Sequence, residues 1–351
     1  MNAAAPAPVY ATAAADPARD RQTVLGIWHD NLGEPARMQA KFDWVYRDSP
    51  LGAPLTMILH HLASGEAVGV ATAAPRRMRI GAREIRAGVL VDLAVLPAHR
   101  TLGPALQLQQ ALLDAASIRF DLIYGFPNRK AVPVFKRVGY ASLGELVRHA
   151  RVLRHREYLA LRMPRLLAAL AGPVVDLGVR LRDSWRSRSD SRWRTLWVDS
   201  TATTGDAHQI DDEVLDREVL HGVHDRQFLG WRFDPRPVGA TRTLQLLDPD
   251  SGQVQAWFVC HHSECDLHVD DCGSATQQLG VARAQVDALV SAARAAGCRS
   301  VSMQLAAPPD SLAAWQNCGF VQRSARPIFG RWFGNGPQPD HYYLTAADED
   351  E

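Results

Sequence analysis

The chain has 351 residues, of which 46% are hydrophobic and 22% are charged, so it is long enough for two domains and excludes a mostly disordered or fibrous protein. Its formal net charge of +1 gives no indication of a nucleic-acid partner. The five cysteines are an odd number and all follow residue 259, which indicates a reducing, cytoplasmic setting rather than a disulfide framework.

The N-terminal residues 1–20 are rich in alanine and proline. They contain neither a basic segment nor a sustained apolar one, so we expect a disordered leader rather than a targeting signal. No uninterrupted run of about 18 apolar residues occurs in the chain, and no membrane span is expected.

Residues 21–150 predict one α/β domain. Its expected elements are a helix at about 23–37, a hairpin of strands 55–62 and 67–74 around Ser64-Gly65, a strand at 89–95, a helix at 104–119, a strand at 121–125 and a helix at 131–137 that ends at Gly139. Strands joined through helical crossovers indicate a mixed sheet that is covered by helices on both faces.

Residues 151–194 predict a basic helical linker. Between residues 148 and 194 the chain has twelve arginines and four acidic residues, and Pro164 and Pro173 are expected to break or kink a helix. An apolar run at 166–171 is flanked by Arg162, Arg165, Arg180, Arg182, Arg186 and Arg188. The linker could pack between two domains and be solvated by its arginines. Alternatively, it could form a surface for peripheral contact with anionic lipid or an acidic glycan.

A sequence pattern of the first half recurs in the second. The motif Trp-x-aromatic-x-x-x-Pro-x-Gly occurs at 44–52 and at 231–239, and a short helix ending in Gly-aromatic is expected before 139–140 and before 319–320. We therefore expect two tandem copies of one α/β unit. The second copy would span residues 195–346, followed by an acidic tail at 347–351.

The junction between the strand at 89–95 and the next helix carries the clearest chemical signal. A loop that enters a helix exposes backbone N–H groups at the positive end of the helix dipole, which suits a pyrophosphate. Gly103 lets the backbone approach a ligand closely, and Arg100 adds a cation.

Two motifs carry a resemblance to a known family. Arg100, Gly103 and Ala105 match a Gln/Arg-x-x-Gly-x-Gly/Ala loop, and Asn128 precedes a short helix that ends at Gly139-Tyr140. With these motifs, residues 22–147 resemble the GNAT superfamily of acyl-CoA acyltransferases. The whole chain looks most like tandem-GNAT proteins associated with bacterial polysaccharide biosynthesis, and the Fem-type aminoacyltransferases are more distant. The resemblance implies an α/β (α+β) fold of two tandem GNAT-like mixed β-sheet domains flanked by helices.

The resemblance also implies a set of site residues. Acetyl-CoA would be the co-substrate, bound by Ala94, Val95, Arg100, Thr101, Leu102, Gly103, Ala105 and Asn128. Asp92 is the candidate general base, because it is the only charged residue of the apolar strand; the alternative is a carboxylate that pairs with an arginine or caps a turn. Asn128 is a second candidate catalytic residue, and its alternative is a plain turn role.

The chain departs from the family pattern at two positions. Pro104 removes one backbone N–H from the phosphate cradle. Phe135 lies where the family often has a tyrosine that reprotonates the leaving thiolate. Tyr124, Tyr140 or solvent could take that role.

The second half repeats the loop pattern at 277–282, where Gln277, Gly280 and Ala282 match. However, Pro308-Pro309 replaces the Asn128 position and Trp315 falls where Phe135 does. We expect a degenerate copy that completes the acceptor site or the fold; a weakened cofactor site is the alternative.

A cluster of metal-ligand residue types lies in the same half, at Cys260, His261, His262, Cys265, His268 and Cys272. No second paired unit at ligand spacing follows them, and the stretch reads as a hairpin that turns at Ser263-Glu264. We therefore expect no metal.

Taken together, the sequence predicts a cytoplasmic acyltransferase that acts on a small-molecule or glycan acceptor, such as an amino sugar. Two alternatives stay open. One is a Fem-like transferase that uses aminoacyl-tRNA. The other is a non-catalytic tandem GNAT module that binds a glycan or a protein.

Overall fold

The computed structural model describes residues 8–29, 31–160, 163–186, 193–199, 201, 219–234, 240–277, 279–334 and 338–349. At residues 102, 157 and 184–186 it describes the backbone alone. Several residues of the predicted motifs therefore lie outside the described residues, namely Arg162, Arg188, Pro237 and Gly239.

The first half of the chain alternates helices and strands. Its elements are β1 (Tyr10–Ala14), α1 (Arg21–His29), α2 (Pro35–Phe42), the π-helical turn η1 (Asp43–Arg47), β2 (Leu55–His61), β3 (Ala67–Ile80), β4 (Arg83–Val95), η2 (Pro97–His99), α3 (Leu102–Arg119), β5 (Leu122–Gly125), α4 (Val132–Val138) and β6 (Ala141–Val152).

Two helices connect this half to the second, α5 (Arg156–Ala160) and α6 (Arg165–Arg186). The second half then has β7 (Arg194–Val198), β8 (Val219–Gly222), α7 (Arg226–Phe233), β9 (Thr241–Leu247), β10 (Val254–Ser263), β11 (Asp266–Ser274), α8 (Arg283–Ala295), β12 (Ser300–Ala306), α9 (Pro309–Asn317), β13 (Val321–Trp332), β14 (His341–Thr345) and η5 (Ala346–Asp348). Its order from β9 to β13 repeats the order from β2 to β6.

Local signals account for most of these boundaries. Gly65, with φ of 71°, turns the hairpin between β2 and β3, and Gly139, with φ of 92°, ends α4 in the left-handed conformation. The helix expected at 23–37 is instead two helices, because Gly33 has φ of 118° and Pro35 begins α2.

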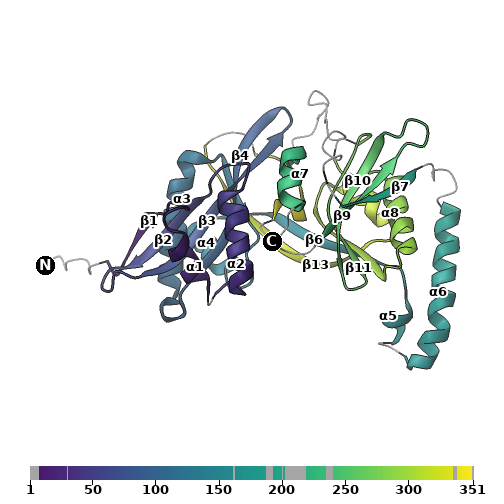
Figure 1. Cartoon of the computed structure of the whole chain (residues 1–351), viewed down its shortest axis with the longest axis horizontal. Coiled ribbons are helices and arrows are strands. Elements are labelled where there is room, and N and C mark those ends of the chain that lie inside the picture. Colours follow the sequence, from purple (N-terminus) through teal and green to yellow (C-terminus); the bar gives the residue numbers. More distant parts are fainter. Residues whose placement is uncertain are drawn as a thin grey trace.

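The two halves share one mixed sheet. Its order over the described strands is β1-β2-β3-β4-β5-β13-β6-β12-β11-β10-β9-β7, while β8 and β14 pair with each other off this path. β13 pairs antiparallel with both β5 and β6, and β6 pairs antiparallel with β12. β6 of the first half thus pairs with strands of the second half, and β13 of the second half pairs with strands of the first, and these exchanged strands cross the middle of the molecule in Figure 1. The predicted boundaries at 150 and 195 consequently do not separate two independent sheets.

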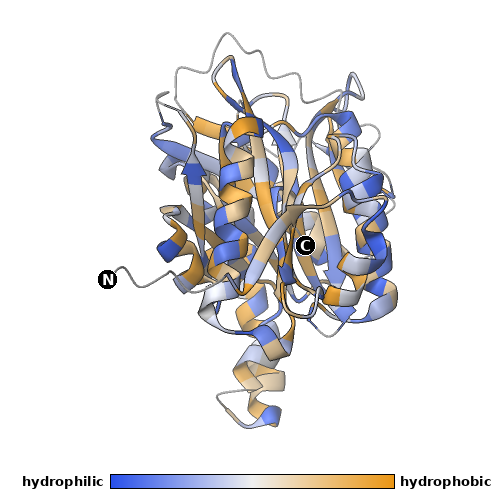
Figure 2. Cartoon of the chain, turned by 90° about the vertical axis from the view of Figure 1, so that its left-hand side faces the viewer, coloured by the Kyte–Doolittle hydropathy of each residue, from blue (hydrophilic) through white to orange (hydrophobic). Residues whose placement is uncertain are grey.

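The repeated tryptophans meet where the halves join. Trp44 Nε1 donates to the Trp231 carbonyl at 2.8 Å, and Trp231 Nε1 donates to the Trp44 carbonyl at 2.9 Å. Their rings lie 5.3 Å apart, inside a core cluster with buried residues from both halves. The apolar strands of this core lie at the centre of Figure 2. The recurring motif thus supplies reciprocal contacts between the halves.

The expectation of a disordered leader is wrong for residues 10–14. These residues form β1, which pairs antiparallel with β2. Tyr10 also places its hydroxyl 3.0 Å from His99 Nδ1. The alanine-rich composition hid this strand because its stability comes from ladder hydrogen bonds to a strand some 45 positions away rather than from its own side chains. Residues 1–7 lie outside the described residues.

The expected acidic tail is also different in the structure. Asp348 and Glu349 are buried, and Asp348 bonds with His224. The carboxylates therefore take part in the interior, because a histidine from the second half partners one of them. Residues 350 and 351 lie outside the described part.

The linker is helical, as predicted. Pro164 directly precedes α6, while Pro173 lies inside that helix, which continues to Arg186. Among the described residues, no helix is both long enough and apolar enough to cross a membrane.

Candidate functional site

β4 has a bulge near the end of its pairing with β5. The register of β3 and β4 shifts between the Val70–Ala94 and Thr72–Val91 pairs. Between these pairs β4 has one residue more than β3, which makes a β-bulge at Asp92. Asp92 has φ of 54°, in the left-handed region that non-glycine residues rarely adopt. Strain of this kind often lies at functional sites.

An opening between β4 and β5 adjoins the bulge. The two strands pair in parallel from Ala87–Leu122 to Val89–Tyr124 and then separate. Among the described strands, none pairs with the β5-facing edge of β4 beyond Val89. Backbone groups on that edge therefore have no ladder partner among the described strands, which leaves them to bond with a ligand or water. The predicted Ala94 and Val95 lie on this stretch.

The Asp92 carboxylate is buried and paired. Its Oδ1 accepts from Lys41 Nζ at 2.8 Å, and its Oδ2 accepts from the Tyr46 hydroxyl at 3.0 Å. The Asp92 side chain is 2% exposed and that of Lys41 is 16% exposed. The Tyr46 oxygen also lies 2.8 Å from Thr72 Oγ1. The predicted pairing of this carboxylate with a cation thus occurs, but the cation is a lysine of α2.

The predicted phosphate loop lies just beyond β4. Arg100 Nε donates to the Val95 carbonyl at 3.0 Å, and its Nη2 donates to Asn31 Oδ1. Arg100 therefore ties the loop to β4 and to the segment after α1. Thr101 is the N-cap residue of α3 and makes no side-chain cap hydrogen bond. Leu102 begins that helix, and Ala105 packs against the core.

Gly103 stands beside open space. A Cβ added there would meet no heavy atom within 4 Å, and its backbone does not have a positive φ. Neither packing nor backbone conformation thus requires glycine at this position. A ligand that approaches the backbone closely would require it, so Gly103 fits the loop's predicted contact with a pyrophosphate.

Asn128 caps the turn before α4. Its Oδ1 accepts from the backbone N–H groups of Lys130 at 3.0 Å and Ala131 at 3.1 Å. This is the turn role that the sequence left open as an alternative. The side chain is exposed, and a contact between Asn128 and a ligand stays a prediction.

Neither candidate tyrosine presents a free hydroxyl to the opening. The Tyr124 hydroxyl donates to the Asp348 carbonyl at 3.0 Å, and the Tyr140 hydroxyl donates to Gln109 Oε1 at 3.1 Å. Burial raises the pKa of Tyr140. Phe135 packs in the same core cluster as Tyr140. Of the three proton donors proposed from the sequence for the leaving thiolate, both tyrosines are bonded elsewhere and solvent remains.

The second half has a corresponding bulge, but its opening is filled. The register of β10 and β11 shifts between the Val259–Asp271 and Cys260–Val269 pairs, so Asp270 is the extra residue. β11 pairs in parallel with β12 only as far as Val269. Beyond that point β14 takes its place beside β12, as Thr345 with Leu305 and Leu344 with Ala306.

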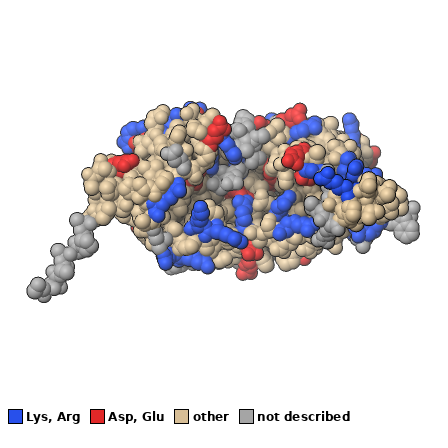
Figure 3. Space-filling model, turned by 90° about the horizontal axis from the view of Figure 1, so that it is seen from below, with Lys and Arg blue, Asp and Glu red and all other residues tan. Residues whose placement is uncertain are grey.

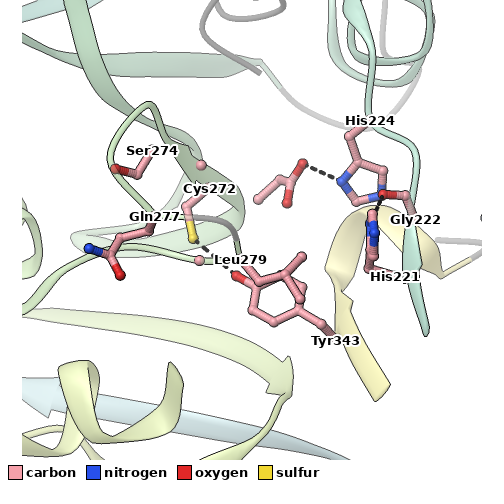
Figure 4. Close-up of a pocket in the computed structure, with 11 residues that line it drawn as sticks. His221, Gly222, His224, Cys272, Ser274, Gln277, Leu279 and Tyr343 are labelled. Atoms are coloured by element: carbon pink, nitrogen blue, oxygen red, sulfur yellow. Dashed lines mark hydrogen bonds and ion pairs between the residues drawn. The ribbon is translucent and has the colours of Figure 1, made fainter. Parts of the chain in front are cut away.

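A side chain of β14 contacts the loop at residues 277–282. The Tyr343 hydroxyl lies 3.8 Å from Cys272 Sγ, as Figure 4 shows. The same hydroxyl would lie 3.1 Å from a Cβ at Gly280, whose φ is 80°. Gly280 therefore serves a turn and a close contact within the protein, in contrast to Gly103. The cavity that remains there has about 20 Å³, room for about one water molecule.

A buried ion-pair cluster holds the inserted segment. His224 Nδ1 lies 2.8 Å from Asp271 Oδ2, and its Nε2 lies 3.0 Å from Asp348 Oδ1. Burial opposes a charge on His224, but the two carboxylates outweigh it and raise its pKa to about 10. Thr345 adds a hydrogen bond from Oγ1 to Asp271 Oδ1 at 3.0 Å. His224 is consequently a cation at neutral pH.

Two further pockets lie on the surface of the described residues. One, of about 350 Å³, lies between α1 and α2. The other, of about 640 Å³, lies in the second half between residues 276–283 and α9. The pocket between α1 and α2 adjoins the helix that also carries Lys41. The pocket of the second half lies outside β14, the strand that fills the β11–β12 opening.

The cysteine and histidine cluster forms a hairpin, as predicted. β10 and β11 meet at Ser263–Asp266, and Glu264 in the turn has φ of 55°. Cys260 and Cys272 are buried in an apolar cluster. Within the described part of the chain, no group of three or more histidine, cysteine or acidic side chains is placed to hold a metal ion.

The overall fold is similar to those of solved structures. A conserved protein of unknown function from Enterococcus faecalis V583, a probable N-acyltransferase, has a TM-score of 0.62 and 11% identity over 93% of this chain and 73% of its own. GCN5-related N-acetyltransferases from Kribbella flavida and Anabaena variabilis ATCC 29413 each have a TM-score of 0.60 over 92% of this chain. They are 14% and 10% identical, over 71% and 72% of their own lengths.

These likenesses show that the chain has the GCN5-related N-acetyltransferase, or GNAT, fold, and they confirm the predicted mixed α/β class. No protein-family model matches the sequence. No curated protein matches it either.

Sequence reasoning missed three residues that the structure brings to these sites. Lys41 carried no motif, because its role depends on how α2 docks against β4. Tyr46 lies within the repeated Trp-x-aromatic motif, which could have directed attention to it. His224 gave no signal, since its partners Asp271 and Asp348 are distant in sequence.

Proposed function

We propose that the chain is an acyltransferase that moves an acetyl group from acetyl-CoA to an amine or hydroxyl, with the opening between β4 and β5 as its site. The difference between the two halves carries this proposal. In the first half, no described strand pairs with the β5-facing edge of β4 beyond Val89, and Gly103 faces open space. In the second half β14 and Tyr343 fill the corresponding places.

The geometry also supports a mechanism. The acceptor nitrogen or oxygen attacks the thioester carbonyl carbon; the new bond forms as the carbon–sulfur bond breaks, and the coenzyme leaves as a thiolate. The acceptor proton passes to the Asp92–Lys41 pair, directly or through one water. The thiolate takes a proton from solvent, which needs little assistance at a thiol pKa of about 8.5. Asp92 and Lys41 are thus the residues to which we assign proton transfer.

We also propose that the two halves are copies of one GNAT-like unit. The recurring order of elements, the bulge at Asp92 and at Asp270, and the reciprocal bonds of Trp44 and Trp231 support a common origin. The second copy would contribute β13 and structural support rather than a second acyl-CoA site.

The acceptor we propose is the amine or hydroxyl of an amino sugar or glycan precursor, as in polysaccharide biosynthesis. The pocket of about 350 Å³ beside α2 supports a polar acceptor, because Gln22, His29 and Gln39 line it together with Leu25 and Met38. Amide and imidazole groups can hydrogen-bond to sugar hydroxyls.

Calorimetry with acetyl-CoA tests the site. We expect one molecule bound per chain, and we expect Gly103→Ala to weaken binding, because its Cβ meets no protein atom but would stand where the pyrophosphate approaches the backbone. Gly103→Gln should weaken binding through bulk alone, and Gly103→Glu should abolish it through added repulsion of phosphate. Full affinity in both larger variants would show that this loop does not hold the coenzyme.

The acceptor needs a separate experiment. Mass spectrometry of the protein mixed with acetyl-CoA and nucleotide-sugar amines should reveal an acetylated product. A chain that binds such sugars but binds no acetyl-CoA would instead be a non-catalytic glycan-binding module.

A further inference from the structure

Helix α6 has an apolar stripe that faces solvent. Leu166 is 82% exposed, Leu170 is 73% exposed and Val174 is 70% exposed. At about 100° of rotation per residue, six of the seven exposed large apolar residues of α6 fall within an arc of about 100°; the seventh, Val175, is 38% exposed and lies outside this arc. The members of this apolar stripe are Leu166, Leu167, Leu170, Val174, Leu177 and Leu181.

The polar side of the same helix faces the protein. Asp176 Oδ1 accepts from the backbone N–H of His155 at 3.0 Å, and Asp183 Oδ2 accepts from Arg294 at 2.7 Å and from Arg151. Ala168 is buried on this side. The helix is therefore reversed relative to an ordinary surface helix, which turns its apolar side inward.

Close packing fixes this orientation. A Cβ at Gly172 would lie 2.8 Å from the Cα of Arg156, so α5 and α6 approach one another closely at this glycine. The hairpin of α5 and α6 lies at one end of the molecule in Figure 1, and its lower tip extends below the body in Figure 2. The apolar stripe is thus held outward by contacts on the opposite side of α6.

Cations lie along the stripe. By helical geometry Arg180 and Arg182 lie on its two sides, and both are exposed, as is Arg165 at the start of the helix. Figure 3 shows basic side chains beside an uncharged area at this end of the molecule. The acidic residues of α6 are Asp176 and Asp183, and both bind inward; Asp183 Oδ1 also lies 3.8 Å from Arg182 Nη2, with an Arg182 side chain that is 55% exposed.

We propose that the apolar stripe of α6 and its flanking arginines dock on the surface of a bilayer that contains anionic phospholipid. The helix lies parallel to the membrane plane, with leucine and valine side chains among the acyl chains and guanidinium groups at the lipid phosphates. This surface would hold the acyltransferase next to a membrane, independently of its acetyl-CoA site.

The charge distribution favours lipid over a second copy of the chain. A two-fold dimer through α6 would place the same surface against itself. Arg180 and Arg182 would then face a surface whose acidic residues of α6 already have basic or backbone partners within their own chain. An anionic bilayer supplies the opposite charge to these arginines.

Co-sedimentation with vesicles tests the proposal. Full-length protein should bind vesicles that contain phosphatidylcholine and phosphatidylglycerol in a ratio of about 7:3. Its binding to vesicles of pure phosphatidylcholine should be at least about tenfold weaker. The variant Leu170→Glu/Leu177→Glu should lose at least about tenfold of its binding to the anionic vesicles, because it places carboxylates among the acyl chains. Arg180→Gln/Arg182→Gln should reduce the preference for anionic lipid.

The matched control is Ile118→Glu/Val321→Glu, which alters two exposed apolar residues outside α6 and should bind as the wild type does. Near-ultraviolet circular dichroism confirms that each variant is folded. The proposal is overturned if wild-type protein stays in solution with anionic vesicles, or if Leu170→Glu/Leu177→Glu sediments as the wild type does. A wild-type dimer in light scattering that this variant converts to a monomer, without vesicle binding by either, would identify a dimer interface instead.

Discussion

Asp92 combines a left-handed backbone, deep burial and an ion pair with Lys41. We expect Asp92→Asn to lower turnover by about 10²- to 10⁴-fold, because the amide fills the same space but cannot accept a proton. The Kd for acetyl-CoA should change by less than about threefold, since the side chain points away from the phosphate loop toward α2 and η1. Steady-state kinetics and calorimetry measure the two quantities.

The variant Lys41→Met tests the other member of the proposed proton-transfer pair. It removes the ion pair but keeps the carboxylate, so we expect it to lower turnover as well. Wild-type turnover in this variant would show that proton transfer does not need Lys41. If Asp92→Asn instead retains most of its activity from about pH 6 to about pH 9, the proton passes through another group.

His224 provides a pH-dependent contribution to stability. Its pKa is about 10 in the folded protein, against 6.5 for an ordinary histidine. The folded state therefore holds a proton that the unfolded state releases above about pH 6.5, and stability from this group is lost as pH rises toward about 10. Urea unfolding of wild-type protein should show a falling midpoint across that window.

The variant His224→Gln should lack this pH-dependent component. At neutral pH it leaves Asp271 and Asp348 buried without their cation, and we expect a loss of about 3–5 kcal/mol in the free energy of unfolding. A variant with wild-type stability at pH 7 would mean that the cluster is hydrated or neutral in the folded protein.

At the level of elements, the insertion of β13 between β5 and β6 depends on a glycine. A Cβ at Gly330 would lie 2.5 Å from Leu143 Cδ1 and 2.7 Å from the Ile123 carbonyl oxygen. We expect Gly330→Val to destabilise the protein by about 1–3 kcal/mol or more through overpacking. Chemical denaturation measures the effect.

The control Gln322→Val introduces the same side chain at an exposed position of β13 and should change stability by less than about 0.5 kcal/mol. Equal effects at both positions would show that valine perturbs β13 generally rather than its insertion at Gly330.

Elements with local signals could be predicted from the sequence, and those that depend on distant pairing could not. Gly65 and Gly139 mark a turn and a helix end by their own backbone conformations, so the β2–β3 turn and α4 were predicted near their true positions, although β3 continues to Ile80 rather than ending at residue 74. β1 has no such marker and exists because β2 pairs with it. The exchange of β6 and β13 likewise depends on registers between strands far apart in the chain.

The residues of the candidate site also divide into those with a local sequence signal and those that depend on distant contacts. The loop at Arg100 and Gly103 was singled out by its spacing, because a loop that enters a helix is a local structure, and its contact with a phosphate stays a prediction. The partner of Asp92 was predicted only as a nearby arginine, since Lys41 is separated from it by 51 positions. Thus the sequence predicted the position of the loop before α3, whereas the bonds of Asp92 to Lys41 and Tyr46 depend on tertiary packing.

At the scale of the whole molecule, the exchanged strands make the halves depend on one another. We expect fragments 1–189 and 190–351 to be insoluble or unfolded when produced separately, because each lacks the strand that completes its sheet. Produced together, they should associate and recover the circular dichroism spectrum of the intact chain.

A cooperative unfolding transition in either isolated fragment would contradict this dependence. The control is the intact chain with a protease site inserted at residue 189, cleaved after folding. It should keep its native spectrum, because the strand contacts are then already made.

The position of β13 also has a consequence for synthesis on the ribosome. β5 ends at Gly125, but its neighbour β13 is complete only at Trp332. At about 5–20 residues per second, roughly 200 further residues take about 10–40 s to translate. During that interval the nascent first half presents an open strand edge to the cytosol. Chaperone supply and translation speed, rather than the stability of the finished protein, should then limit the yield of active chain.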